Sequence, residues 1–231
     1  MITAPEALDA LTALGNSEKA AEMAKYHKVD RPYLGVSNPD ITDLANQWRS
    51  DTDLDGRLAL AQDLWDSNCH EARIVAAKLW VQARIKPDDD LVWDQICRWV
   101  PEFDGWAIAD AVALSAHRRL TANPDRLNDL VAWTTSDHLW SKRAALVFTL
   151  PWTKQRHPKP AEAAAREMIL GWAAEYTTDP NQFIQKSVSS WLQELAKRDP
   201  DHVRAFLTEH GAEMKPYARK NVARTLPPEA V

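Results

Sequence analysis

The sequence predicts an all-α protein, and three observations support this class. Glycine is scarce, at 6 of 231 residues, which disfavours a sheet fold rich in tight turns. Apolar residues recur at helical spacing, as in Leu58, Ala61 and Trp65, and no convincing alternating run of strand length appears. Proline followed by an acidic or polar residue recurs along the chain. Together these patterns predict about ten to twelve helices of about 8–18 residues each.

Six proline-containing triplets mark the expected helix starts. Asn or Asp can cap a helix, proline fits its first position, and an acid in the first turn interacts favourably with the helix dipole. The triplets are Ala4-Pro5-Glu6, Asn38-Pro39-Asp40, Lys86-Pro87-Asp88, Asn123-Pro124-Asp125, Asp179-Pro180-Asn181 and Asp199-Pro200-Asp201. The chain is expected to divide into helices at these points.

Several helical segments resemble one another, each with a basic residue in its first turn and small apolar residues after it. Arg143, Lys186 and Arg219 are 43 and 33 residues apart, and the interval of 70 between Arg73 and Arg143 would hold two units. Periods of about 33–47 residues built from helix pairs are typical of HEAT-type repeats. The predicted architecture is a HEAT-like α-solenoid (an α-α superhelix) that forms a single domain over residues 1–231.

The recurring basic residues suggest a binding face. If Arg73, Arg143, Lys186 and Arg219 start the inner helices of their pairs, they form a basic stripe on one side of a protein whose net charge is -5. Phosphate backbones bind such stripes by charge neutralisation and counterion release. Taken singly, each residue is better explained as the solvated end of an ordinary helix. Their recurrence at one repeat position is what favours a shared face.

Composition limits the other possibilities. The net charge of -5 weakly opposes nucleic-acid binding, although the distribution of charge matters more than its sum. No apolar run approaches the length of about 18 residues expected of a membrane span, and the N-terminus lacks a signal-peptide pattern. Cys69 and Cys97 form neither a disulfide framework nor a metal-binding spacing. We therefore expect a cytoplasmic protein without a metal or cofactor.

Three blocks of sequence carry a family resemblance. The three blocks are Met23-Ala24-Lys25-Tyr26 with Tyr33-Leu34-Gly35-Val36-Ser37-Asn38-Pro39, then Ser136-Asp137-His138-Leu139-Trp140-Ser141-Lys142-Arg143-Ala144-Ala145, then Phe183-Ile184-Gln185-Lys186 with Ala196-Lys197-Arg198-Asp199-Pro200. With these blocks the chain resembles the AlkD-type DNA alkylation repair family of HEAT-like alkylpurine DNA glycosylases, over about residues 17–226. The corresponding family patterns are a Tyr followed by Leu-Gly-(Ile/Val)-x-x-Pro, then Ser-Asp-x-x-Trp-x-x-Arg-Ala-Ala, then a third block.

The resemblance places the family's catalytic motif in residues 91–101. In glycosylase members this motif reads Trp-Trp-Asp-x-Val-Asp, and its final Asp is the catalytic carboxylate. Here Trp93 and Asp94 match, whereas Cys97 occupies the catalytic position. An arginine that lines the lesion site in the family matches Arg143. A tryptophan of the third block falls on Ser190, with Trp191 one residue later.

The replacement by Cys97 bears directly on catalysis. Cleavage of a glycosidic bond builds positive charge on the sugar, and a carboxylate stabilises that charge. A thiol with a pKa of about 8.5 is mostly neutral at pH 7 and is a poor substitute. Asp94 lies three residues earlier on the same helix face and is the candidate replacement. Its alternative role is that of a helix cap or a structural hydrogen-bond acceptor.

The resemblance also implies a set of DNA-binding residues. Trp93 is expected to present a partly open face to the DNA, with packing as the alternative. The other tryptophans at core spacing are Trp65, Trp80, Trp140 and Trp172, which are predicted to pack. The predicted DNA-binding residues are Trp93, Arg143, Lys142, Lys186, Arg219 and Tyr26.

We therefore predict a monomeric protein that binds double-stranded DNA, including alkylated duplex, along a concave face and is nucleoid-associated when bound. The resemblance is to glycosylases that excise N3- and N7-alkylated purines, and the loss of the catalytic Asp predicts binding without efficient excision. The alternative is a non-catalytic HEAT scaffold whose groove binds a protein. The two differ in salt dependence, because DNA binding weakens steeply as salt rises.

Overall fold

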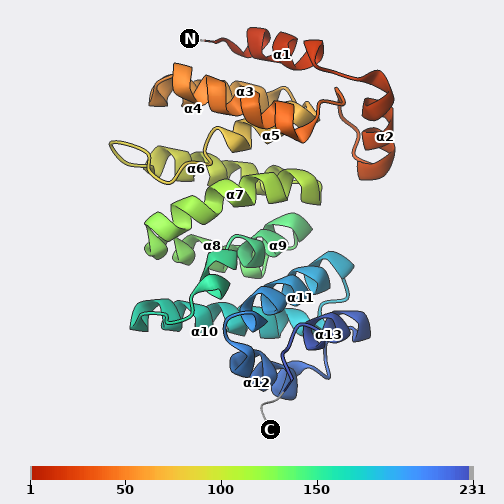
Figure 1. Ribbon diagram of the computed structural model, residues 1–231, viewed down its shortest axis with the longest axis vertical. Coiled ribbons are helices and arrows are strands. Elements are labelled where there is room, and N and C mark those ends of the chain that lie inside the picture. The colour runs from red at the N-terminus through yellow and green to blue at the C-terminus, as the bar shows by residue number, and fades with distance from the viewer. Residues whose placement is uncertain (1, 229–231) are drawn as a thin grey trace. The chain divides into compact units, whose positions relative to one another are not determined.

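The computed structural model describes residues 2–228, and this part of the chain contains thirteen α-helices, four short 3₁₀ helices and no strand (Figure 1). The predicted all-α class is confirmed. The helices are more numerous than expected because proline also starts helices at Pro160 and Pro216, neither of which is followed directly by an acidic residue. In the described part, no helix combines the length and apolar character needed to cross a bilayer.

The helices group into two compact units, which are described separately here. Unit 1 comprises the described residues up to Asn123, and unit 2 those from Pro124 onward. The single repeat domain that the sequence predicts stays a prediction. Unit 1 contains α1 (Ala4–Ala13), α2 (Ser17–His27), α3 (Asn38–Asp51), α4 (Leu54–Asp66), α5 (His70–Lys78), α6 (Asp90–Trp99), η1 (Val100–Glu102) and α7 (Trp106–Ala122).

Helix α5 is the centre of unit 1. It packs against α3, α4 and α7, and seven of its nine residues are buried. Around it, the indoles of Trp65 and Trp99 stack with their ring centroids 4.4 Å apart. Trp80 is fully buried and donates its indole N–H to Oε1 of Gln95 at 3.0 Å. In contrast, α2 buries none of its residues and lies at the edge of the unit (Figure 1).

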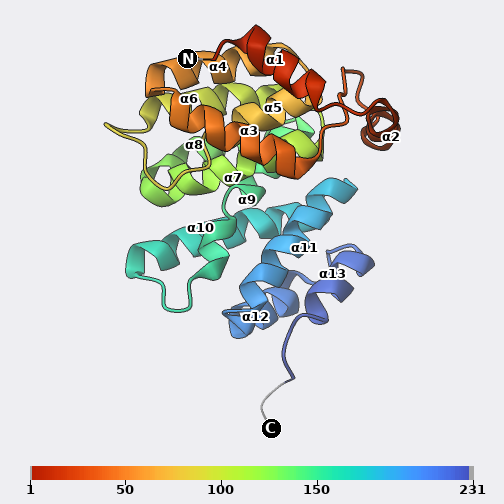
Figure 2. The same cartoon turned by 45° about the horizontal axis from the view of Figure 1, so that its top comes forward.

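Unit 2 is built around α11. It contains η2 (Pro124–Arg126), α8 (Leu127–Thr134), α9 (Leu139–Val147), η3 (Leu150–Lys154), α10 (Pro160–Glu175), η4 (Tyr176–Thr178), α11 (Gln182–Ala196), α12 (Pro200–His210) and α13 (Pro216–Ala223). Helix α11 packs against α9, η3, α12 and α13, so that α9, α11 and α13 form a row of neighbours (Figures 1 and 2). Trp191 is buried in this helix and donates to Oγ1 of Thr149 at 3.1 Å.

The proline triplets predict three α-helix starts well and three less well. Pro5, Pro39 and Pro200 lie in the first two positions of α1, α3 and α12. Pro124 starts only a 3₁₀ turn. The remaining two precede their helices, because Pro180 lies two residues before α11 begins and Pro87 follows a cis peptide bond three residues before α6.

Candidate functional site

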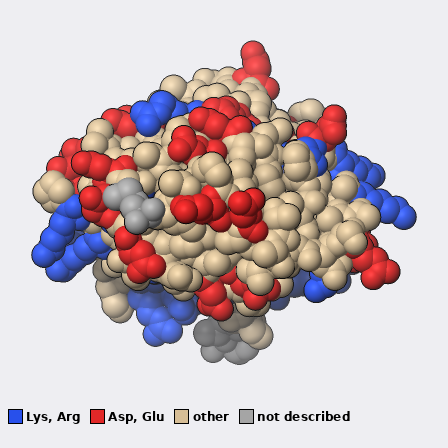
Figure 3. Space-filling model, turned by 90° about the horizontal axis from the view of Figure 1, so that it is seen from above, with Lys and Arg blue, Asp and Glu red and all other residues tan. Residues whose placement is uncertain are grey.

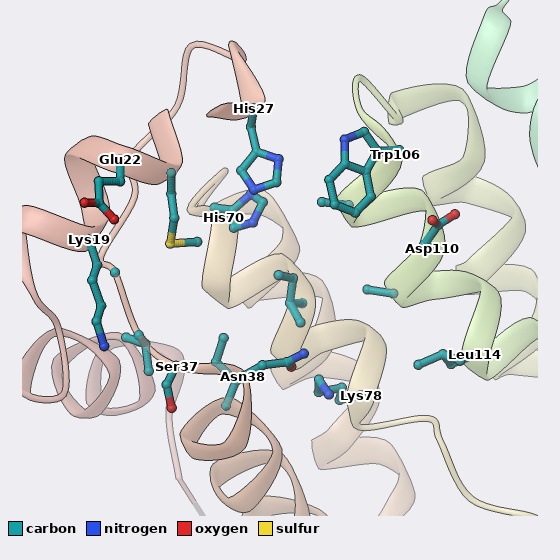
Figure 4. A pocket seen from close by; sticks show the side chains of 17 residues that line it. Lys19, Glu22, His27, Ser37, Asn38, His70, Lys78, Trp106, Asp110 and Leu114 are labelled. Carbon is teal, nitrogen blue, oxygen red and sulfur yellow. The ribbon is translucent and has the colours of Figure 1, made fainter. Parts of the chain in front are cut away.

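A cleft of about 710 Å³ opens in unit 1. One wall is α2 and the opposite wall is the first half of α7. Helix α5 and the segment of residues 35–41 form the floor between them (Figure 4). The volume lies within the range of about 300–1,000 Å³ that is usual for small-ligand sites.

The floor of the cleft is fixed by one buried carboxylate. Glu71, in the first turn of α5, accepts backbone hydrogen bonds from Leu34 (3.0 Å), Gly35 (2.7 Å) and Val36 (3.4 Å). Gly35 has φ +74, and a Cβ there would lie 2.1 Å from the carbonyl oxygen of Asn16, so only glycine fits. The Leu-Gly-Val segment of the sequence therefore serves to shape the cleft.

Aromatic rings and imidazoles gather at one end of the cleft. His27 of α2 lies between the rings of His70 (centroids 4.6 Å apart), Trp106 (5.4 Å) and Tyr33 (6.0 Å, stacked). Tyr26 meets the edge of Trp106 at 6.0 Å. Tyr26 is 69% exposed beside Trp106, and Trp106 itself lines the cleft and is 37% exposed, so the indole can contact a ligand there.

The two histidines at this end are neutral at pH 7. Burial lowers the pKa of His70 to about 3, and the nearby His27 and Arg31 act in the same direction. Burial also lowers the pKa of His27, with Arg31 adding to the effect and Glu71 opposing it. The aromatic end of the cleft therefore carries imidazole rings without positive charge.

Charged side chains occupy the two walls. Trp106 and Asp110 project from α7, one turn apart, and both line the cleft opposite Lys19 and Glu22 of α2 (Figure 4). Lys78 lies toward the other end, where its amino group donates to Oγ1 of Thr42 at 2.9 Å. A ligand in the cleft would meet an indole face, a carboxylate and amino groups within one cavity.

The predicted catalytic stretch lies on α6, and none of its residues lines this cleft. Asp94 is exposed and Cys97 is half-buried. Trp93 is only 4% exposed, so the expectation of a partly open indole face is wrong and Trp93 is reassigned to packing. The roles predicted for Asp94 and Cys97 stay predictions.

Sequence reasoning missed the pair formed by Trp106 and Asp110. The family motif separates its second Trp from its catalytic Asp by four residues, the spacing from Trp93 to Cys97. The same spacing recurs thirteen residues later, from Trp106 to Asp110, with the carboxylate intact. Gly105 before α7 and the amphipathic start of that helix were the available signal. The adjacent Trp-Asp dipeptide of residues 93–94 directed the match to α6 instead of α7.

The residues of the predicted basic stripe in unit 2 have different surroundings. Arg143 and Lys186 lie on the neighbouring helices α9 and α11, and each places its cation over an aromatic ring of its own helix. Lys142 instead forms an ion pair with Asp179 at 2.6 Å and contacts the ring of Tyr176. Arg219 is exposed on α13. The concave DNA-binding face itself stays a prediction.

Arg73 was expected to belong to the stripe, and this is wrong. It is only 7% exposed, and its guanidinium lies 4.6 Å from the ring centroid of Trp65. Its Nε donates to the Trp65 carbonyl at 3.0 Å, and its NH2 group pairs with Glu102 at 3.5 Å. A buried arginine with these partners stabilises the packing of α4 against α5.

Charge is unevenly divided between the units. Residues 1–123 carry 13 Lys and Arg against 20 Asp and Glu, a formal net charge of -7, and residues 124–231 carry 15 against 13, a net charge of +2. On the end of the molecule that carries α1, carboxylates are spread across the face and basic side chains lie mainly at its margins (Figure 3). The basic character therefore belongs to unit 2.

These features define an all-helical repeat protein with an open, aromatic-lined cleft in unit 1. The profile of the family described as DNA alkylation repair enzyme matches residues 7–226. The chain belongs to this family, and the resemblance seen in the sequence is confirmed. Among curated proteins, none matches the chain.

Solved structures share the fold. A structure described as a predicted DNA alkylation repair enzyme from Enterococcus faecalis is similar with a TM-score of 0.75 at 19% identity, covering 94% of this chain and 98% of that chain. AlkD2 from Streptococcus mutans is similar with a TM-score of 0.63 at 18% identity, covering 93% and 99%. The protein smu.31 from Streptococcus mutans UA159 has a TM-score of 0.63 at 19% identity, covering 82% and 92%. At these identities the likeness establishes the fold.

Proposed function

We propose that this protein binds duplex DNA and hydrolyses the N-glycosidic bond of alkylated purine nucleotides in the cleft of unit 1. Family membership supports a role in DNA alkylation repair. The observation that carries the proposal is that Trp106 and Asp110 line one cleft, one helical turn apart. The candidate carboxylate is thus Asp110 of α7, and the absence of a carboxylate at Cys97 no longer argues against excision.

The chemistry requires a carboxylate near the sugar. Departure of the base breaks the bond between C1′ and the purine nitrogen, and the electron pair leaves with the base. An alkylated purine carries positive charge, so it departs as a neutral molecule, and charge develops on the deoxyribose. Asp110 stabilises that cation and orients the water whose oxygen bonds to C1′, while the proton of the water passes to Asp110 or to solvent.

The aromatic end of the cleft suits a cationic base. Trp106 and Tyr26 are exposed enough to contact it, and an indole face attracts a cation within about 6 Å of its centroid. Neutral His27 and His70 add ring surface without repelling the charge, because burial lowers the pKa of both. A protonated imidazole in the same place would oppose binding of a positively charged base.

The test is release of alkylated base from a duplex that carries an N3- or N7-alkylpurine. We expect the wild-type protein to release base above the spontaneous rate, and Asp110→Asn to lower the rate by about 10²–10³-fold. Asp94→Asn is the matched control, since it makes the same change on α6, and should stay within about twofold of wild type.

Two outcomes would contradict the assignment. If Asp94→Asn abolishes release while Asp110→Asn does not, the carboxylate is on α6. If base release appears only after Cys97→Asp, the wild-type protein is a binder without excision. Duplex affinity measured over a salt series then separates DNA binding from a protein-binding scaffold, because only the former falls steeply with log[salt].

A further inference from the structure

Three alternate helices of unit 2, α9, α11 and α13, begin in the same way. The second residue of α9, α11 and α13 is aromatic, and the fifth residue is a cation. The aromatic residues are 43 and 34 residues apart along the chain, and the cations repeat the same two intervals. The six residues, called the aromatic–cation ladder below, are Trp140 and Arg143, Phe183 and Lys186, and Tyr217 and Lys220.

The contacts join the ladder into one surface. The rings of Trp140 and Phe183 lie 4.9 Å apart, which brings the first turns of α9 and α11 together. The hydroxyl of Tyr217 donates to the carbonyl of Gln182, the residue before Phe183, at 3.3 Å. The ring of Tyr217 therefore lies beside the first turn of α11. The helices that carry the three rungs are neighbours in the row of α9, α11 and α13 (Figure 1).

Each cation lies on the same side as its ring. The Arg143 guanidinium lies 5.8 Å from the Trp140 ring centroid, and the Lys186 amino group lies 5.5 Å from that of Phe183. Lys220 follows Tyr217 by three residues and shares its helix face. The measured distances place a positive charge next to an aromatic ring in the first two rungs, and the helical spacing puts the two residues of the third rung on one face.

The three aromatic rings of the ladder are not fully buried in the core. Tyr217 is 41% exposed, and Trp140 and Phe183 are half-buried, whereas the tryptophans predicted alongside Trp140, such as Trp65 and Trp80, are fully buried. The prediction that Trp140 is a packing residue therefore holds for only part of its surface. Lys186 and Lys220 are exposed.

We propose that the aromatic–cation ladder binds an unpaired strand of nucleic acid, with bases or sugars against the rings and phosphates against the cations. Alternation of partly exposed rings with positive charge is the arrangement by which proteins hold single strands, because every base has a face that can stack. A paired duplex offers its phosphates but keeps its base faces stacked on one another. The rings would then contribute nothing to duplex binding beyond contacts to sugars.

The length of the site follows from the helix spacing. Packed helices are about 8–10 Å apart, so three rungs span about 16–20 Å. At about 3.4 Å per stacked nucleotide, this corresponds to about 5–6 nucleotides. This inference deepens the proposed function by naming a second DNA structure that the protein holds, and it does not depend on excision.

The experiment measures the affinity of the full chain for a fluorescein-labelled 12-nucleotide thymidine strand and for a labelled 12-base-pair duplex, by fluorescence anisotropy over a salt series. We expect Phe183→Leu and Trp140→Leu each to weaken strand binding by about 5-fold or more, and to change duplex binding less. Leucine keeps apolar volume but removes the flat ring. Thermal melting confirms that each variant is folded.

The cations have a matched control. Lys186→Ala and Lys220→Ala should each reduce the slope of log K against log[salt] for the strand by about 0.7, whereas Lys197→Ala, an equal charge change beyond the other end of α11, should not. Equal effects of all three lysine changes on the salt slope would mean that the strand is held by the general charge of the protein and not by the ladder. Unchanged strand affinity in both leucine variants, or absence of strand binding, would overturn the proposal.

The two proposals fail separately. Asp110→Asn should abolish base release and leave strand binding unchanged, because Asp110 lies in the cleft of unit 1. Strand binding without base release would contradict only the excision proposal. Base release without strand binding would contradict only the proposal that the ladder binds an unpaired strand.

Discussion

Both units place functional candidates in the first turns of helices, but the charges of these side chains have opposite signs. In unit 1, α7 begins with Trp106 and presents the carboxylate of Asp110 one turn later. In unit 2, α9, α11 and α13 begin with an aromatic residue and present a cation three residues later. The net charges of -7 and +2 follow the same division. A repeated helical frame therefore separates a pocket suited to cationic chemistry from a surface suited to phosphates.

The units also differ in how they fix their loops. In unit 1 the buried carboxylate of Glu71 accepts three backbone N–H groups from residues 34–36. In unit 2 the buried amide of Gln185 donates to the carbonyls of Tyr176, Thr177 and Asp179, and its oxygen accepts the N–H of Lys215. The two side chains differ by one functional group, and each matches the polarity of the backbone that faces it.

Exchanging the amide of unit 2 for a carboxylate should have the largest effect. In Gln185→Glu an ionised oxygen would face three carbonyl oxygens at the 2.7–3.0 Å distances now occupied by N–H donors. Burying an uncompensated charge costs about 3–5 kcal/mol, so we expect a loss of that order in the free energy of unfolding. Urea denaturation measures it.

The control for this exchange is Gln182→Glu. Gln182 is exposed in the first turn of α11, where a negative charge is favoured by the helix dipole, so it should change stability by less than about 1 kcal/mol. A Gln185→Glu variant as stable as Gln182→Glu would mean that the amide does not hold the loop.

The sequence predicted these loops unequally. Gly35 within the Leu-Gly-Val segment signals a backbone that other residues avoid, and the segment does shape the cleft. Nothing near Glu71 or Gln185 in the sequence indicates which loop each side chain holds. The partners of Glu71 lie 35–37 residues earlier in the chain, and the loop conformation sets the polarity of the partners of both side chains.

The candidate site could also be predicted only in part from the sequence. Helical class and family were predicted from period and motif, but which helix face lines a cleft depends on packing. Trp93 and Asp94 are adjacent in sequence, yet one is buried and the other exposed. Trp106 and Asp110 are farther apart in the chain and lie in the same cleft. Similarly, Arg73 looks like a stripe residue until Trp65 and Glu102 are seen around it.

The converse exchange in unit 1 should cost less. In Glu71→Gln one carboxylate oxygen becomes an NH₂ group, so that either the N–H of Leu34 or the N–H groups of Gly35 and Val36 lose their acceptor. A buried donor left without a partner costs about 1–3 kcal/mol. We expect a drop of that size in the free energy of unfolding, together with slower base release because the floor of the cleft is loosened.

Amide hydrogen exchange at two places tests whether the effect of Glu71→Gln is local to the loop that Glu71 holds. Amide hydrogen exchange of residues 34–36 should accelerate in Glu71→Gln, while the amide of Lys215 in unit 2 should exchange as in the wild type. An unchanged exchange rate at residues 34–36 would contradict the role of Glu71, whatever the change in overall stability.

The smallest expected effect is a pH dependence confined to unit 1. Burial lowers the pKa of His70 to about 3, against an unfolded value of 6.5. The unfolded chain therefore binds the proton more readily between these limits, and stability rises with pH from about 3 to about 6.5. The contribution is fully present above pH 6.5, and about 1 kcal/mol of it is lost at pH 5.5.

His70→Phe keeps a ring among His27, Tyr33 and Trp106 but cannot be protonated. Its free energy of unfolding should therefore fall less than that of the wild type between pH 7.5 and pH 5.5, by about 1 kcal/mol. His157→Phe, at an exposed position in unit 2, should leave the pH dependence as it is. If the free energy of unfolding falls equally with pH in the wild type and in His70→Phe, the imidazole of His70 takes up its proton in the folded state. The cleft would then accept a cationic base only at pH values above the pKa of His70. The difference between the units would persist in charge and in loop polarity, but the neutral ring surface proposed for the aromatic end of the cleft would be lost.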